Sequence, residues 1–219
     1  MSRTHLSTQN PIRRRTLILG ATFALAVVAS IHGMPASAAA SVGQPAPDFT
    51  VTDTQGTARS LSSLKGKVVV LEWTNADCPF TKKHYDSANM QNLQREAASA
   101  GVVWLSVISS APGEQGYVTP TEANKLTSNR KAAPTGVLLD PEGKLGHAYG
   151  AMTTPHMFVI DTQGVLRYAG GIDSLGTTSA ADIPKAVPYF RNALLSVEKG
   201  EAVAQPQTRP YGCSVKYSS

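Results

Sequence analysis

The chain has 219 residues, of which 20 are Lys or Arg and 15 are Asp or Glu, and its formal net charge is +5. Four of the basic residues and none of the acidic ones lie within residues 1–38, so the remainder of the chain has a net charge of only +1. The basic balance is therefore no sign of nucleic-acid binding. The remaining residues, about 180, are enough for one domain with a substantial core.

Residues 1–38 have the organisation of a secretory signal peptide. Arginines at 13–15 precede an uncharged apolar run at 17–31, which is too short for a comfortable membrane span, and Ala36-Ser37-Ala38 supplies an A-x-A cleavage site. We therefore expect a periplasmic or secreted protein, cleaved near Ala38, with no stable membrane anchor after cleavage. The alternative is an uncleaved N-terminal anchor. Adjacent arginines are typical of twin-arginine export, but Arg13 stands where that route usually has Ser or Thr, so general secretion also fits.

Apolar periodicity and turn residues divide the rest of the chain into strands and helices. Strands are expected at residues 48–51, 68–71, 102–108, 134–140, 157–160 and 165–170. Helices are expected at residues 61–64 (a single turn), 80–100, 119–132, 144–149 and 183–199. Residues 201–219 lack periodicity and contain Pro206, Pro210 and Gly212, so an irregular tail is expected there.

The order of these elements predicts the fold class. Val68–Leu71 is a continuous apolar run, typical of a strand buried on both faces. Strands separated by helices imply parallel pairing, whereas the four-residue turn at 161–164 (D-T-Q-G) predicts an antiparallel hairpin. We therefore expect an α/β fold with a central mixed β-sheet flanked by helices.

Cys78 stands between the expected strand at 68–71 and the expected helix at 80–100. The N-terminus of a helix stabilises an anion, so a thiol there tends to have a lowered pKa and to be a nucleophile. Pro79 suits the first helical turn. Lys82 and Lys83 would lower the pKa further if they faced the sulfur, although lysines on a first turn are usually solvated. The alternative is that Cys78 is a small buried apolar residue.

The chain has one other cysteine, Cys213, in the expected tail. In an oxidising compartment, two cysteines are also compatible with a single structural disulfide. The cysteine content therefore leaves a catalytic and a structural interpretation open.

Four segments carry recognisable motifs: Ala46–Phe49 (A-P-D-F), Glu72–Thr81 (E-W-T-N-A-D-C-P-F-T), Thr154-Pro155 and Phe158–Asp161. Together they resemble the thioredoxin-fold redoxins of the alkyl hydroperoxide reductase / thiol-specific antioxidant (AhpC/TSA) family, in its periplasmic thioredoxin-like subgroup. The resemblance covers residues 41–217. It implies a thioredoxin-like domain at 41–200 and a tail at 201–219 that carries Cys213.

The resemblance also implies roles for individual residues. Cys78 matches the attacking cysteine, and Pro155 matches the cis-proline that faces it and, with Thr154, shapes a substrate groove. Thioredoxins have a second cysteine where this chain has Thr81. Peroxiredoxins have Pro and Thr or Ser where this chain has Leu71 and Asn75. Asn75 and Thr81 are the candidates to replace the missing hydrogen-bonding group.

The preferred hypothesis is a thiol oxidoreductase that uses no cofactor and no metal. Cys78 would attack a disulfide or a peroxide, and Cys213 would resolve the product with the help of a mobile tail. The partners would be that substrate and an unidentified thiol electron donor. Because Leu71 and Asn75 replace the residues that peroxiredoxins use, disulfides are favoured over peroxides as the substrate. The alternative is a non-catalytic secreted protein in which a structural Cys78–Cys213 disulfide fixes the tail to the domain.

A second alternative is a copper-chaperone-like metal site, in which Cys78, His84, His147 and His156 would supply the ligands. No C-x-x-x-C motif or close histidine pair supports it. His84 is expected to face solvent. His156 is expected either to line the groove or to lie at the core edge with its ring bonded to the backbone.

Overall fold

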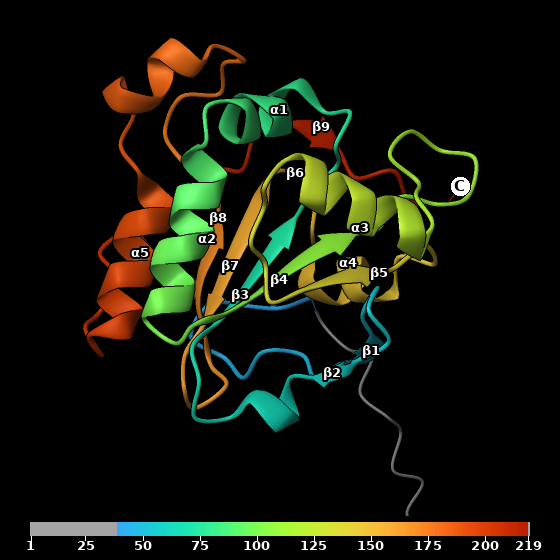
Figure 1. Ribbon diagram of the computed structural model, residues 1–219. Coiled ribbons are helices and arrows are strands. Elements are labelled where there is room, and N and C mark those ends of the chain that lie inside the picture. The colour runs from blue at the N-terminus through green and yellow to red at the C-terminus, as the bar shows by residue number, and fades with distance from the viewer. Residues whose placement is uncertain (1–38, 219) are drawn as a thin grey trace, which may run out of the picture. The chain divides into compact units, whose positions relative to one another are not determined.

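A five-stranded sheet forms the centre of the computed structural model, which describes residues 39–218 (Figure 1). In order across the sheet, its strands are β5 (Gly136–Leu139), β4 (Val103–Ile108), β3 (Val69–Trp73), β7 (His156–Ile160) and β8 (Leu166–Gly170). Strands β3, β4 and β5 are parallel, whereas β7 is antiparallel to both β3 and β8. The predicted α/β fold with a mixed sheet and an antiparallel hairpin is confirmed.

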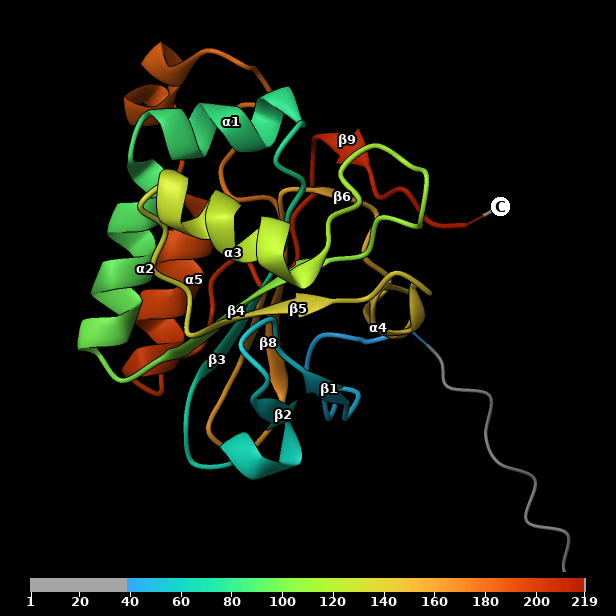
Figure 2. The same cartoon turned by 45° about the vertical axis from the view of Figure 1, so that its right-hand side comes forward.

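Helices cover both faces of this sheet. One face carries α2 (Asn89–Ser99), α3 (Pro120–Asn129) and α5 (Tyr189–Glu198), and the other carries α4 (Lys144–Tyr149) (Figure 2). Helix α1 (Pro79–Asp86) follows β3 at the end of the sheet. The remaining elements are short: β1 (Thr50–Thr52), β2 (Ala58–Ser60), η1 (Ser62–Leu64), β6 (Thr153–Thr154), η2 (Ala180–Lys185) and β9 (Cys213–Ser214). None of the helices in residues 39–218 has the length and apolar character needed to cross a membrane.

Strand β3 is buried on both faces, as its apolar run predicts. Val70 belongs to the core cluster beneath α2 and α5, whereas Leu71 and Trp73 belong to the cluster beneath α4. Successive side chains of a strand point to opposite faces, so one apolar run contributes to both clusters. Trp73 is fully buried in the second cluster.

The same strand carries a buried carboxylate, Glu72. It accepts hydrogen bonds from the Tyr85 hydroxyl (2.8 Å), the Trp104 indole (2.8 Å), the Ser106 hydroxyl (3.0 Å) and the Gln94 amide (3.3 Å). Burial raises the pKa of this carboxyl, although the hydrogen bonds oppose the shift. Sequence reasoning missed this group, whose signal is a Glu within an otherwise apolar strand.

The prediction of one helix over residues 80–100 is wrong, because the chain breaks between α1 and α2. Ala88 has a left-handed backbone, with φ 60°. Polar side chains bond to carbonyl groups near the break: the Ser87 hydroxyl donates to Lys83 O (2.7 Å), and the Gln91 amide donates to Tyr85 O (2.8 Å). Such side-chain bonds replace the backbone hydrogen bonds that the helix lacks at the break. Because polar residues form them, the spacing of the apolar residues does not reveal the break.

The predicted helix at 183–199 is also wrong in its first part. Residues 180–185 form the 3-10 turn η2, and α5 begins only at Tyr189. Pro188 explains the interruption, because a proline disfavours helical geometry at the preceding residue, Val187.

The C-terminal tail is irregular, as expected, apart from the two-residue strand β9. It does not project freely, because residues 206–217, here called the C-terminal strap, lie against the domain. The strap is bonded at Ala169 N–Pro206 O (3.1 Å), Val215 N–Met152 O (2.9 Å), Ala111 N–Lys216 O (2.8 Å) and Tyr217 Oη–Ala151 O (2.7 Å). In this structure the tail is thus docked along the domain by these bonds.

Replacing Glu72 tests how much the buried polar cluster stabilises the fold. Glu72→Leu leaves buried donors on Tyr85, Trp104 and Ser106 without an acceptor, so we expect a loss of at least about 3 kcal/mol in the free energy of unfolding. Ser106→Ala, which removes one donor, should cost only about 1 kcal/mol. Urea denaturation measures both, and equal losses would contradict this assignment.

Candidate active site

Cys78 is the N-cap residue of α1. Its backbone is extended (φ −71°, ψ 123°), Pro79 follows at the first helical position, and Lys82 N donates to Cys78 O (2.9 Å) to close the first turn. Cys78 N donates to Asn75 O (3.2 Å), which fixes the loop leading from β3. The predicted position of the thiol at a helix N-terminus is confirmed.

The Cys78 thiol is fully buried and faces the segment around β6. Its sulfur donates a hydrogen bond to Thr154 O (3.0 Å), and the following Thr154–Pro155 peptide bond is cis, as the resemblance implies. Thr154 is also the register partner of Cys213 in the antiparallel pairing of β6 with β9. One residue therefore links the two cysteines, although they lie far apart in the sequence.

Gly212 allows this close approach. Its φ is +137°, and a Cβ atom there would overlap the carbonyl oxygen of Thr154. Because glycine has no side chain, the strap can lie directly against the carbonyl that bonds Cys78.

The two thiols are both free and have opposite electrostatic environments. Burial alone would raise the pKa of Cys78, but the neighbouring polar groups of Cys213, Thr154 and Thr81 favour the thiolate, so the net shift of its pKa is downward. Burial and the neighbouring Cys78 raise the pKa of Cys213 to about 11. Cys78 is therefore the more acidic of the two thiols.

The other expected site residues differ in whether their side chains are already hydrogen-bonded. Thr81 and Thr154 are buried, and neither side-chain hydroxyl has a close hydrogen-bond partner with good geometry. The Asn75 amide is already bonded, because it donates to Gln115 O (3.2 Å) and accepts from Asp77 N (2.9 Å). Of the two candidates to replace the missing peroxiredoxin hydroxyl, Thr81 is the one whose hydrogen-bonding capacity is free.

The three histidines have separate partners. His156 accepts from Met152 N (3.3 Å) and packs on Phe158, so of its two expected positions the backbone-bonded one at the core edge is confirmed. His147 stacks on Tyr217. Within residues 39–218 no three His, Cys, Asp or Glu side chains converge as a metal site would require, so the copper alternative receives no support.

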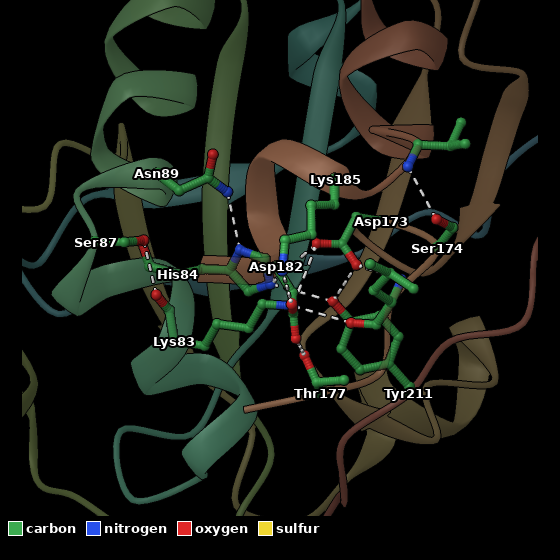
Figure 3. A network of polar contacts seen from close by, with 12 residues as sticks. Lys83, His84, Ser87, Asn89, Asp173, Ser174, Thr177, Asp182, Lys185 and Tyr211 are labelled. Atoms are coloured by element: carbon green, nitrogen blue, oxygen red, sulfur yellow. Dashed lines mark hydrogen bonds and ion pairs between the residues drawn. The ribbon is translucent and has the colours of Figure 1, made fainter. Parts of the chain in front are cut away.

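The expectation that His84 faces solvent is wrong. His84 is fully buried, and burial lowers its pKa to about 4 despite the opposing charge of Asp173. Its ring contacts the Asn89 amide (2.9 Å) and the Tyr211 hydroxyl (3.2 Å) (Figure 3). Lys83 is buried in the same cluster, whereas Lys82 is exposed. Sequence reasoning missed Asp173 and Tyr211, for which no local motif gives a signal.

A strand–helix corner with an N-cap cysteine, a cis-proline opposite it and this strand order define a thioredoxin-like thiol protein. The model of the AhpC/TSA family matches residues 42–169, which is more than half of the chain. The chain belongs to the AhpC/TSA family and, with it, to the general class of thiol oxidoreductases.

Individual proteins are similar to this chain at low identity. The chain is 28% identical over 140 residues to a Coxiella burnetii protein assigned as peroxiredoxin bcp, which covers 64% of this chain and 85% of that protein. An uncharacterised conserved protein of Geobacillus kaustophilus has a similar structure, with a TM-score of 0.69 and 23% identity over 81% of this chain and 93% of that one. A structure assigned as the thiol:disulfide interchange protein DsbE of Chlorobium tepidum has a TM-score of 0.54 and 22% identity, and covers 73% of this chain and 99% of that one.

The buried histidines predict a loss of stability in weak acid. Burial lowers the pKa of both His84 and His156 from 6.5 to about 4, so the unfolded state binds more protons between these values. The free energy of unfolding should therefore fall as the pH decreases from 7 to 5, by roughly 2 kcal/mol per histidine. Urea denaturation at several pH values measures this slope.

The matched variants separate the histidines from other titrating groups. His156→Gln should remove about half of the slope between pH 7 and 5, whereas His147→Gln, at an exposed position, should leave it intact. A slope of zero in the unmodified protein would show that the two rings are not buried in their neutral form.

Proposed function

We propose that the protein is an exported thiol oxidoreductase in which Cys78 attacks a disulfide or a peroxide and Cys213 resolves the product. The observation that carries this proposal is the placement of Cys213 opposite Thr154, whose carbonyl oxygen bonds Cys78. A nucleophile that lacks a second cysteine on its own helix needs a partner thiol from elsewhere, and the strap supplies one.

The first step uses the lowered pKa of Cys78. The thiolate attacks one sulfur of a disulfide, forming a mixed disulfide and releasing the other sulfur as a thiolate. With a peroxide, it attacks one oxygen, forms a sulfenic acid and releases an alcohol or water once the leaving oxygen is protonated. The downward shift of the Cys78 pKa supports its role as the attacking thiol.

The second step uses Cys213. Two of the causes that raise its pKa, the hydrogen bond and the charge of Cys78, disappear once Cys78 is covalently modified. Cys213 then attacks the Cys78 sulfur, forms the Cys78–Cys213 disulfide and releases the substrate thiol or, from a sulfenic acid, water. An external thiol donor returns both cysteines to the reduced state.

Disulfides are the proposed preferred substrate. Leu71 and Asn75 replace the residues that accompany the attacking cysteine of peroxiredoxins, and the Asn75 amide is bonded to the backbone. Because β9 covers Cys78, a bulky disulfide needs the strap to move aside, whereas a small disulfide needs less displacement. We also propose export to the periplasm or the exterior on the basis of residues 1–38, which lie outside the described residues.

Replacing each cysteine separates their roles. Cys78→Ser should lose at least about 100-fold in the rate of disulfide or peroxide turnover, because the nucleophile is gone. Cys213→Ser should still react once and then accumulate a mixed disulfide with glutathione, or a sulfenic acid with hydrogen peroxide. Mass spectrometry of the two variants and the unmodified protein detects these species, and unchanged turnover by Cys78→Ser would exclude the proposal.

The reduction potential distinguishes this function from the structural alternative. We expect the Cys78–Cys213 disulfide to have a potential above about −300 mV, as redox-active disulfides do. Equilibration with defined dithiothreitol mixtures, followed by alkylation and mass measurement, gives the value. A potential below that threshold would favour a permanent staple of the strap.

A further inference from the structure

Three buried side chains and the half-buried Tyr211 connect α1 to the strap (Figure 3). Lys83 and His84 come from α1, Asp173 from the loop after β8, and Tyr211 from the strap. The Tyr211 hydroxyl donates to Asp173 Oδ1 (2.6 Å) and lies 3.2 Å from His84 Nε2. Lys83 Nζ lies 3.5 Å from Asp173 Oδ2.

The hydrogen bonds in this cluster have one consistent direction. The Asn89 amide donates to His84 Nδ1, so the neutral imidazole carries its proton on Nε2 and donates it to the Tyr211 oxygen. The Tyr211 hydroxyl donates a hydrogen bond to the Asp173 carboxylate, which also accepts from Leu175 N (2.9 Å). Lys83 supplies the compensating positive charge and donates to Leu175 O (2.9 Å). A buried carboxylate that loses such a partner becomes an uncompensated buried charge, which destabilises the fold.

Tyr211 is the only member of this cluster that belongs to the strap. It lies two residues before Cys213, and its ring packs edge-on against Phe80, two residues after Cys78, with a centroid distance of 5.8 Å. The cluster therefore fixes the strap to the helix at a point close to both cysteines. Other strap contacts near Cys213 are the short β6–β9 pairing and the hydrogen bonds of Val215, Lys216 and Tyr217 to residues 152, 111 and 151.

We propose that Lys83, His84, Asp173 and Tyr211 form a latch that holds the strap in place, and that Tyr211 is the positioning residue that keeps Cys213 beside Cys78. This inference rests on the proposed function, because it assigns the latch to the resolving step. Both cysteines are free here and the strap is already docked. The resolving thiol is therefore in place before Cys78 reacts, and its attack is intramolecular with little chain to order.

The latch predicts a high effective concentration of Cys213 toward Cys78. This quantity is obtained by equilibrating the purified protein with reduced and oxidised glutathione and measuring the dithiol and disulfide forms by mass after alkylation. Tyr211→Phe keeps the ring and its contact with Phe80 but removes the hydroxyl that joins His84 to Asp173. We expect it to lower the effective concentration about tenfold, a change of about 1.4 kcal/mol.

A second readout follows from the burial of Cys78. In the reduced unmodified protein, iodoacetamide should modify Cys78 slowly, because the strap covers the sulfur. Tyr211→Phe should raise this rate several-fold and, after one equivalent of hydrogen peroxide, should increase the sulfenic acid that dimedone captures. A latch with no positioning role would leave both quantities unchanged.

Two control variants distinguish positioning from general stability. Ile160→Val removes one buried methyl group from the last residue of β7, at the opposite end of the strand from His156. It should lower the free energy of unfolding by about 1 kcal/mol. It should leave the effective concentration within twofold of the unmodified value. Tyr117→Phe changes an exposed tyrosine and should have no effect. An equal loss in Ile160→Val and Tyr211→Phe would overturn the proposal.

A further variant keeps the test decisive if Tyr211→Phe does not fold. His84→Gln keeps a donor near Tyr211 but cannot also reach Asn89, so a smaller, several-fold loss is expected; an unchanged value would count against the latch. The proposed function fails separately: the Cys78–Cys213 disulfide would close with glutathione in a latch-dependent manner, yet the protein would turn over neither disulfides nor peroxide.

Discussion

The site depends on the antiparallel pairing of two residues, Thr154 and Cys213. This pairing places the strap on the edge of β6, directly before the cis-proline, and the carbonyl oxygen of Thr154 bonds the Cys78 thiol. A two-residue pairing is too short to be stable by itself. Its persistence requires the contacts on either side, which are the polar cluster around Tyr211 and the backbone bonds of Val215 and Lys216.

Two buried carboxyl groups near the end of β3, those of Glu72 and Asp173, are each held by several side-chain partners. Glu72 accepts four hydrogen bonds from side chains on α1, α2 and β4, and Asp173 faces Lys83, His84 and Tyr211. A buried charge is tolerated only when it is bonded and compensated, so each cluster fixes the elements that supply its partners. Helix α1, which begins at Cys78, contributes to both clusters through Tyr85, Lys83 and His84. The backbone around the nucleophile is thereby held from both sides.

In this chain the second cysteine lies on the strap and not on α1, where thioredoxins have it, and this changes the chemistry that the fold supports. A cysteine at the Thr81 position would be bound to the same helical turn as Cys78, whereas Cys213 approaches only because the whole chain has folded around it. Closing such a long loop has an entropic cost that grows slowly with length, and the contacts that fold the domain already meet it. The arrangement also places a neighbouring thiol whose presence helps to lower the pKa of Cys78 in the reduced state.

Local pattern was sufficient for the fold class and for the nucleophile. The apolar run of β3, the T-P-T-E start of α3 and the turn before β8 are encoded within a few residues, and Cys78 followed by Pro79 indicates the start of a helix. The resemblance added the cis-proline. The break at Ala88, the two-residue strands and the burial of His84 carry no local signal, because each depends on partners from distant segments. Only the tertiary structure brings Asp173 and Tyr211 to α1 and sets Cys213 beside Cys78, since electrostatic and hydrogen-bonding contacts between such distant segments have no periodicity in the sequence.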